Sequence, residues 1–261
     1  MNLISTLKKL PRNSVYSYYL WLLAQKKPKL KTIFINSHMR SGSTLLSHLL
    51  NSHPKIYGIG ETGLTYHSEA DLELMMCRVS WYFRKMSIPE DYVFDKLLHN
   101  RLLVNKDLLN HEDIYYIFLV RNPEDTLLSL SKLFTNRTLP DLYQYYCERL
   151  LMMENDFKNI KNYSKVIIIT YEQLLNETTQ TFETLQRFLQ TKEPFVEQYS
   201  LTPWTGKKYI GDSSKNIKAG YILRKNNKQE TLQFPSDLLQ NAWNYYHKWY
   251  ELQSLTQHNS L

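Results

Sequence analysis

The stretch INSHMRSGSTLLSHLLNSHP, residues 35–54, decides the fold. It opens at the end of residues 31–37, a short β-branched and aromatic run bounded by polar residues, which predicts a buried strand. A turn rich in Ser and Gly follows, and Pro54 closes the segment. Between them, four leucines recur at the spacing of one helix face: Leu45, Leu46, Leu49 and Leu50. The stretch therefore predicts a strand, a turn and a helix over residues 44–52.

The rest of the chain repeats this alternation of apolar runs and helical patterns. Further strand-like runs cover residues 55–59, 114–120 and 165–170. Helical patterns cover residues 71–86, 92–104, 123–134, 141–158, 172–190 and 236–252. Strands that are apolar on both faces and alternate with helices predict an α/β three-layer sandwich, with a mostly parallel sheet between two helical layers. Ligands of such sheets bind at the carboxyl ends of the strands.

The chain is predicted to form one domain over residues 1–261, because no Pro-, Gly- or Ser-rich linker divides it. Residues 1–30 are expected to be an N-terminal helical extension. The apolar run within it, residues 15–24, is too short to span a bilayer, so we expect no stable membrane insertion. Residues 205–235 are basic and irregular, which favours a lid over a charged ligand.

Composition narrows the function classes. The formal net charge of +7 suits an anionic small ligand, a nucleic acid or an acidic membrane. The two cysteines, Cys77 and Cys147, lie too far apart for a zinc motif and do not form a disulfide framework. We therefore expect a reducing, cytoplasmic location and no metal site.

The turn after the first strand is similar to a nucleotide-binding P-loop, G-x-x-x-x-G-K-[ST], but departs from it at two positions. Gly42 and Thr44 match, whereas Ser37 replaces the first glycine and Ser43 replaces the lysine. Backbone N–H groups at the start of a helix favour an anion, and Ser41, Ser43 and Thr44 add hydroxyl donors. Arg40 adds a permanently charged donor fork. The alternative is a plain strand–turn–helix corner without a ligand.

A second arginine lies at the end of the next clear buried strand. Arg121 opens the segment RNPEDTLLS, and Ser129 follows in the predicted helix. Both residues can face the same crevice as the first loop, and together they suit a second phosphate. Alternatively, Arg121 pairs with Glu124 or another acid, and Ser129 is a small packing residue. A ligand with two anionic ends would use both motifs.

One carboxylate and one lysine are further candidates. Glu61, in YGIGET, is expected near the same sheet edge, where it could accept a proton from an attacking hydroxyl. Its alternative is a surface or capping role. Lys106 lies in VNKD, and this local sequence by itself predicts a solvated lysine in a loop.

Two of these segments resemble the sulfotransferases that use 3′-phosphoadenosine 5′-phosphosulfate (PAPS). RSGSTLLSHLLNSHPKIYGIGET resembles the phosphosulfate-binding region of that family, and YYIFLVRNPEDTLLSLSKLF resembles its 3′-phosphate motif. KVIIITYEQLL is also similar to a recurring stretch of the family. The nearest local pattern is that of the tyrosyl-protein and bacterial branches. The resemblance implies the P-loop-like sulfotransferase fold, with PAPS as cofactor, PAP as product and no metal.

The resemblance also implies roles for individual residues. Arg40 and the loop Ser41–Thr44 would hold the phosphosulfate, whereas Arg121 and Ser129 would hold the 3′-phosphate. Glu61 would be the general base, with His67 as the next candidate. Lys106 and Ser214 would offset charge on the transferred group, and the pair Ser214 and Lys215 would reach the cofactor. Arg40 departs from the lysine of the cytosolic branch, and LRKNN at residues 223–227 lacks that branch's glycine.

The expected activity is transfer of a sulfuryl group to a hydroxyl of a small molecule such as a natural product. A saccharide acceptor is the runner-up. A P-loop kinase or other NTPase is a weaker alternative, because the loop lacks its lysine and Arg121 stands where a metal-holding acid would be. A nucleic-acid-binding module would instead show steep salt dependence, and we expect no nucleic-acid partner.

Overall fold

The computed structural model describes residues 14–202, 205, 215–224 and 234–257. Its centre is a sheet of five parallel strands in the order β2-β3-β1-β4-β5. The strands are β1 (Lys31–Ser37), β2 (Ile56–Gly60), β3 (Tyr92–Leu97), β4 (Ile114–Val120) and β5 (Val166–Thr170). Burial along them is nearly continuous, because both faces of the sheet are covered.

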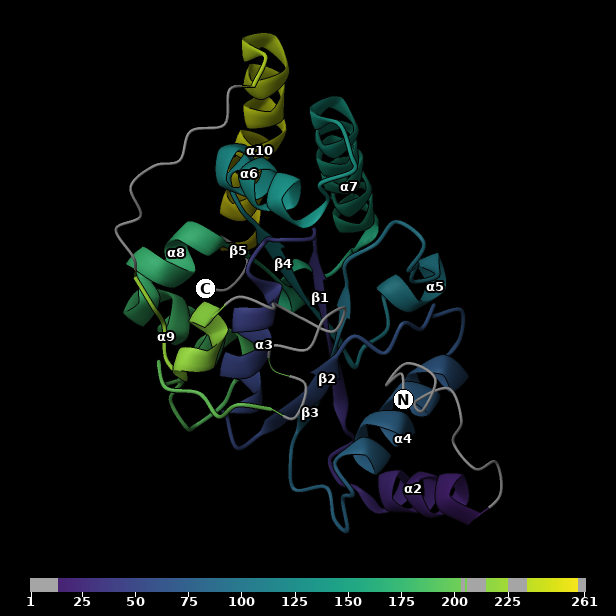
Figure 1. Ribbon diagram of the computed structural model, residues 1–261. Helices are drawn as coiled ribbons and strands as arrows, with labels where there is room; N and C mark the ends of the chain where they lie inside the picture. Colours follow the sequence, from purple (N-terminus) through teal and green to yellow (C-terminus); the bar gives the residue numbers. More distant parts are fainter. Residues whose placement is uncertain (1–13, 203–204, 206–214, 225–233, 258–261) are drawn as a thin grey trace.

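Helices form the two outer layers, as Figure 1 shows. One apolar cluster joins the sheet to α3 (Ser43–Asn51), α8 (Tyr171–Asn176) and α9 (Thr178–Leu189). The other cluster joins the opposite face to α4 (Glu69–Tyr82), α5 (Lys106–Leu109), α6 (Pro123–Leu133), α7 (Leu139–Asn159) and α10 (Ser236–Gln257). The predicted three-layer α/β architecture is therefore confirmed.

The smaller elements lie around this core. Helix α2 (Ser14–Gln25) packs beside α4, and Lys26 forms an ion pair with Asp91 at 3.2 Å. Two short 3₁₀ helices are η1 (Tyr163–Lys165) and η2 (Lys215–Ala219). Among the described residues, no helix combines the length and apolarity needed to cross a membrane.

One predicted element is wrong. Residues 92–104 were expected to be helical, but Tyr92–Leu97 form strand β3 between β1 and β2. The apolar residues Val93, Phe94, Leu97 and Leu98 fit a helix face equally well, so periodicity alone does not separate the two structures. Pairing with both neighbouring strands decides for the strand, and it buries Asp95 and Lys96 inside the protein.

The expected helix over residues 172–190 is divided into α8 and α9. Helix α8 ends at Asn176, and Glu177 lies between the two helices with φ −120°. The other predicted strands and helices agree with the structure to within a few residues at each end. Since all five strands are parallel, their carboxyl ends lie along one edge of the sheet, and the candidate residues follow them.

Candidate functional site

The loop from Met39 to Gly42 connects the end of β1 to the start of α3. Arg40 adopts φ 66° and Gly42 adopts φ 90°, which turns the chain sharply into the helix. A Cβ atom on Gly42 would lie 2.2 Å from Cδ2 of Tyr171. Glycine is therefore required here both for the positive φ and for the close approach of the Tyr171 ring.

One of the backbone amides expected to bind an anion is already used within the loop. The amide of Ser41 donates to the carbonyl oxygen of His38 at 3.3 Å, so it closes the turn. The amides of Ser43 and Thr44 remain in the first turn of α3, where amides have no partner within the helix. Among the described residues, the buried Ser41 Oγ also has no hydrogen-bond partner. These donors make the start of α3 suitable for an anion.

The backbone of Arg121 is fixed on both sides. Its amide donates to Nε2 of His38 at 3.1 Å, and its carbonyl oxygen accepts from the hydroxyl of Tyr146 at 2.8 Å. Burial of His38 lowers the pKa of its imidazole to about 3. The ring is therefore neutral, with Nδ1 donating to the carbonyl oxygen of Met39 at 2.9 Å. His38 thus links the end of β1 to the residue after β4.

The side chain of Arg121 points toward the first loop. Its guanidinium lies over the ring of Tyr171 at 4.4 Å, and Nη1 donates to the carbonyl oxygen of Arg40 at 3.3 Å. It also pairs with Asp125, one turn into α6, at 3.3 Å. Its Nε is buried with no partner within the described part of the chain. The expected acidic partner therefore exists, and Arg121 still faces the loop.

Arg40 joins the two motifs directly. Its Nε donates to Oγ of Ser129 on α6 at 2.7 Å. The loop after β1 and the helix after β4 are therefore in direct contact at the carboxyl edge of the sheet. Arg40 and Arg121 together form a basic strip there.

Glu61 follows strand β2, and its partner is a lysine on the neighbouring strand. The carboxylate of Glu61 lies 3.0 Å from Nζ of Lys96, whose side chain is only 4% exposed against 27% for Glu61. The next residue, Thr62, donates its amide to Asp95 at 2.9 Å, and Tyr66 donates its hydroxyl to Asp95 at 2.6 Å. Burial raises the pKa of Asp95. Adjacent residues of β3 thus hold both the side chain and the backbone around Glu61.

Lys106 lies at the start of α5 and is exposed. Asn105 before it donates to the carbonyl oxygen of His67 at 3.2 Å, so the segment is attached to the loop after β2. Among the described residues, no hydrogen bond or ion pair is seen between Lys106 and Glu61 or Arg121. The cation beside Glu61 is Lys96, and the role expected for Lys106 stays a prediction. In the sequence, Lys96 could have been noticed as part of a charged pair, Asp95-Lys96, inside an apolar run. The prediction of a helix over residues 92–104 gave no reason to place this pair at the site.

Two histidines are candidates for an alternative base. His99 follows β3, and burial lowers the pKa of its ring while the negative charge of Glu61 opposes that shift. His67 is exposed, and its amide donates to Asp71 at 2.9 Å as part of the start of α4. The charge of Glu61 therefore acts on His99. His67, the alternative base expected from the sequence, is exposed at the start of α4.

The C-terminal candidates are described only in part. Ser214 lies outside the described residues, as does most of the basic segment 205–235. Lys215 is the first residue of η2. Thr205 is described, and its hydroxyl lies 2.8 Å from Nε2 of His48 on α3. The start of this segment thus lies against α3, the helix that follows the loop from Met39 to Gly42.

Comparisons with known proteins bear on the family and the fold. Residues 30–248 match the family described as "Sulfotransferase domain". No curated protein matches the sequence. The fold is similar to mouse sulfotransferase SULT7A1 complexed with PAP, with a TM-score of 0.52 and 14% identity over 93% of this chain and 92% of that one.

Two further solved structures share the fold. The sulfotransferase domain of the Synechococcus PCC 7002 olefin synthase has a TM-score of 0.54 and 15% identity over 86% of this chain and 95% of that one. The sulfotransferase domain of the curacin biosynthetic pathway has a TM-score of 0.51 and 18% identity over 84% and 98%.

Proposed function

This chain belongs to the sulfotransferase family, and we propose that it transfers the sulfuryl group of PAPS to a hydroxyl of a small molecule. The observation that carries the proposal is the contact between the two basic motifs. Arg40 donates to Ser129 at 2.7 Å, and Arg121 donates to the backbone of Arg40 at 3.3 Å. Two guanidinium groups on adjacent strand ends suit a ligand that carries several anionic groups.

The residues at this edge fit PAPS. Within the described residues, Ser41 Oγ and Arg121 Nε are buried donors without partners, and phosphate or sulfate oxygens would satisfy them. The start of α3 adds backbone donors. We assign Arg40 and Ser41–Thr44 to the phosphosulfate, and Arg121 and Ser129 to the 3′-phosphate. Lys215 and Ser214 stay candidates from the resemblance alone. When bound, PAPS supplies an activated sulfuryl group and leaves as PAP.

The chain's own residues would then act by position and charge. Glu61 accepts the proton of the acceptor hydroxyl, which makes that oxygen a better nucleophile. Lys96 holds the Glu61 carboxylate at 3.0 Å and brings a cation to the reacting groups. Lys106 stays a candidate for offsetting charge on the transferred group. Arg40 and the α3 amides would stabilise the 5′-phosphate of the leaving group, so protein donors and cations would take the place of a metal.

The acceptor is proposed to be an alcohol on a natural product. Two structural neighbours are sulfotransferase domains from a biosynthetic pathway and from an olefin synthase, which supports that choice. The cysteines support a reducing location such as the cytoplasm, since Cys77 and Cys147 are both free and buried.

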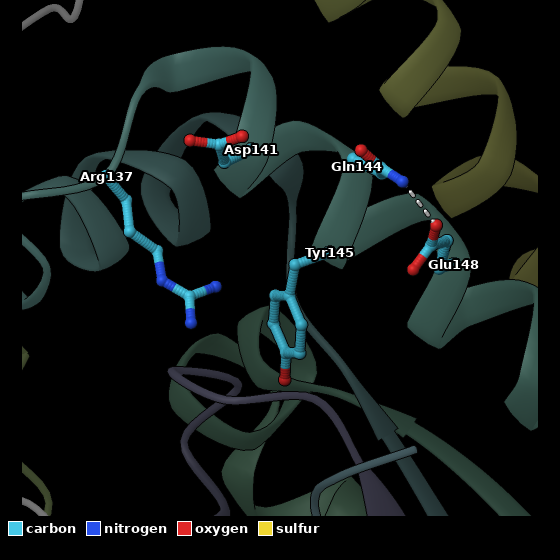
Figure 2. Close-up of a pocket in the computed structure, with 5 residues that line it drawn as sticks. All are labelled: Arg137, Asp141, Gln144, Tyr145 and Glu148. Atoms are coloured by element: carbon cyan, nitrogen blue, oxygen red, sulfur yellow. Dashed lines mark hydrogen bonds between the residues drawn. The ribbon is translucent and has the colours of Figure 1, made fainter.

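A polar groove gives specific support to a saccharide as the alternative acceptor. This groove has a volume of about 400 Å³ and lies where the segment after α6 enters α7. Figure 2 shows the residues that line it, among them Arg137 and Tyr145. Its lining residues are Arg137, Asp141, Gln144, Tyr145 and Glu148. Carboxylate, amide and guanidinium groups suit a molecule with many hydroxyls. Tyr145 also contacts the anion-binding loop, because its hydroxyl accepts from the amide of Met39 at 2.8 Å.

The substitution Glu61→Gln tests the proposed chemistry. It keeps the shape of the side chain and removes the proton acceptor, so we expect turnover to fall by about a hundredfold or more. PAP affinity should stay close to that of the unaltered protein. The measurement is transfer of labelled sulfate from PAPS to a panel of alcohols and saccharides, with PAP affinity measured by calorimetry.

Glu73→Gln, an exposed change on α4, is the matched control and should not alter turnover. Full turnover in the Glu61 variant would remove Glu61 from the mechanism. His99→Asn would then test whether His99 is the base, because the charge of Glu61 acts on its ring.

A further inference from the structure

Strand β1 leads into the anion-binding loop, and strand β3 carries Asp95 and Lys96. The two strands separate at the carboxyl edge of the sheet. The ladder between β1 and β3 ends at the pair Asn36↔Leu97. Beyond that pair, the backbone of β1 continues into the anion-binding loop, and the backbone of β3 continues through Leu98 to His99. Buried peptide groups that leave a ladder need other hydrogen-bond partners.

Arg149 on α7 supplies the first set of partners. Its Nε donates to the carbonyl oxygen of Ser37 at 3.0 Å, and its Nη2 donates to the carbonyl oxygen of Leu97 at 2.5 Å. Nη2 also donates to Oδ1 of Asn36 at 2.5 Å. The residue is only 1% exposed. A buried guanidinium thus bridges the last residues of β1 and β3.

Tyr145, one turn earlier on α7, repeats the bridge one step beyond the strands. Its hydroxyl accepts from the amide of Met39 at 2.8 Å and donates to the carbonyl oxygen of Leu98 at 3.3 Å. Met39 precedes Arg40, and Leu98 lies two residues after Lys96. Two side chains of one helix therefore replace the missing hydrogen bonds of the ladder, each with at least one contact on either strand end.

We infer that Tyr145 and Arg149 are positioning residues that fix the separation between the anion-binding loop and strand β3, whose Lys96 pairs with the base Glu61. The inference rests on the proposed function, because that separation sets the distance from the sulfuryl group to the attacking oxygen. Neither side chain is assigned a contact with the reacting atoms. A displacement of about 1 Å between reacting groups can cost on the order of a hundredfold in rate.

Tyr145→Phe removes the bridge with little change in volume, and Tyr143→Phe is its matched control. Tyr143 lies on the same helix, but its hydroxyl accepts from Nδ2 of Asn241 on α10 at 2.5 Å. The reaction measured is release of labelled sulfate from PAPS to water. In that reaction the bond from sulfur to the bridging phosphate oxygen breaks, a bond to the water oxygen forms, and Glu61 takes the proton.

We expect Tyr145→Phe to lower kcat about 10- to 100-fold while the Kd for PAP changes less than about threefold. Tyr143→Phe should change neither value. The Met39 amide should also exchange with solvent faster in Tyr145→Phe than in Tyr143→Phe, as measured by NMR. A purely structural role would lower Tm but leave kcat unchanged below it, and that result would overturn the inference.

Arg149→Lys gives a second, independent arm. It keeps a cation but cannot bridge three acceptors as the guanidinium does, so kcat should fall again with little change in PAP affinity. The loss in the double variant with Tyr145→Phe should be smaller than the sum of the two single losses in barrier, because both residues act on one gap. Additive losses would contradict the shared role.

The outcomes separate this inference from the proposed function. If the unaltered protein fails to bind PAP, the proposed function fails, and the exchange of Met39 still decides whether Tyr145 holds the loop. If the unaltered protein binds PAP and releases sulfate, equal kcat values for the two tyrosine variants reject the positioning role alone.

Discussion

At the scale of single residues, His38 illustrates how burial fixes a protonation state. The ring donates to the carbonyl of Met39 and accepts from the amide of Arg121, an arrangement that requires a neutral imidazole. Burial is the main cause that lowers the pKa of His38 to about 3; the bond to Met39 opposes this shift, and the positive charges of Arg121 and Arg149 add to it. The histidine therefore serves as a fixed connector between β1 and β4.

His38 makes stability depend on pH. Unfolded histidine titrates near pH 6.5, so the folded protein should keep its full stability above that pH and lose it progressively toward about pH 3. The slope for one such group is about 1.4 kcal/mol per pH unit, which gives a loss of about 2 kcal/mol between pH 6.5 and pH 5. Urea unfolding at several pH values measures it.

His38→Asn is the comparison for this prediction. Asparagine can accept from Arg121 and donate to Met39 but does not titrate, so the variant should lose stability less steeply as the pH falls. Burial lowers the pKa values of His48 and His99 as well, so part of the slope should remain in the variant. Identical slopes in both proteins would show that His38 is not responsible.

At the scale of elements, strand β3 decides which lysine lies beside the base. As a strand, β3 points Asp95 toward Thr62 and Tyr66 and brings Lys96 to Glu61. Successive side chains of a strand point to opposite faces, so two adjacent charged residues serve two different partners. A helix over the same residues would not have paired with β1 and β2 and would have placed Lys96 elsewhere.

The two lysines give a direct comparison of elements. Lys96→Met should lower sulfuryl transfer by about a hundredfold, because it removes a nearly buried cation from the reacting groups. It should also lower Tm, since Glu61 would lose its partner. Lys106→Met should cost less. Steady-state turnover of both variants with PAPS measures the difference, and a larger loss for Lys106 would favour the role that the resemblance gives it.

At the scale of the whole molecule, the net charge of +7 and the basic strip predict how the protein responds to ligands. PAP at about 100 times its Kd should stabilise the fold by about 2.7 kcal/mol. EDTA should not reduce this effect, because the proposed chemistry uses protein cations in place of a metal. The shift in Tm with PAP, with and without EDTA, measures both expectations.

Two controls distinguish the alternatives at this scale. Adenosine, which lacks both phosphates, should produce little shift in Tm. ATP with Mg²⁺ tests the kinase alternative, and a Mg²⁺-dependent shift with ATP but none with PAP would favour a P-loop NTPase over the proposed sulfuryl transfer.

Local sequence determined the strand–turn–helix at Lys31–Asn51, the strand before Arg121 and the α/β layering, because apolar periodicity and turn chemistry act over a few neighbouring residues. Glycine 42 could be predicted as a turn residue, but the Tyr171 ring that requires it came only from the folded chain. Segment 92–104 was ambiguous because its apolar spacing satisfies a strand and a helix alike.

Only the tertiary structure decided the partners of these elements. It brought Lys96 to Glu61, His38 to Arg121 and Ser129 to Arg40, pairs that are 35, 83 and 89 residues apart in the sequence. It also placed Tyr145 and Arg149 between two strand ends. Contacts of this kind depend on the order β2-β3-β1-β4-β5, and that order follows from packing over the whole sheet, which no short stretch of sequence encodes.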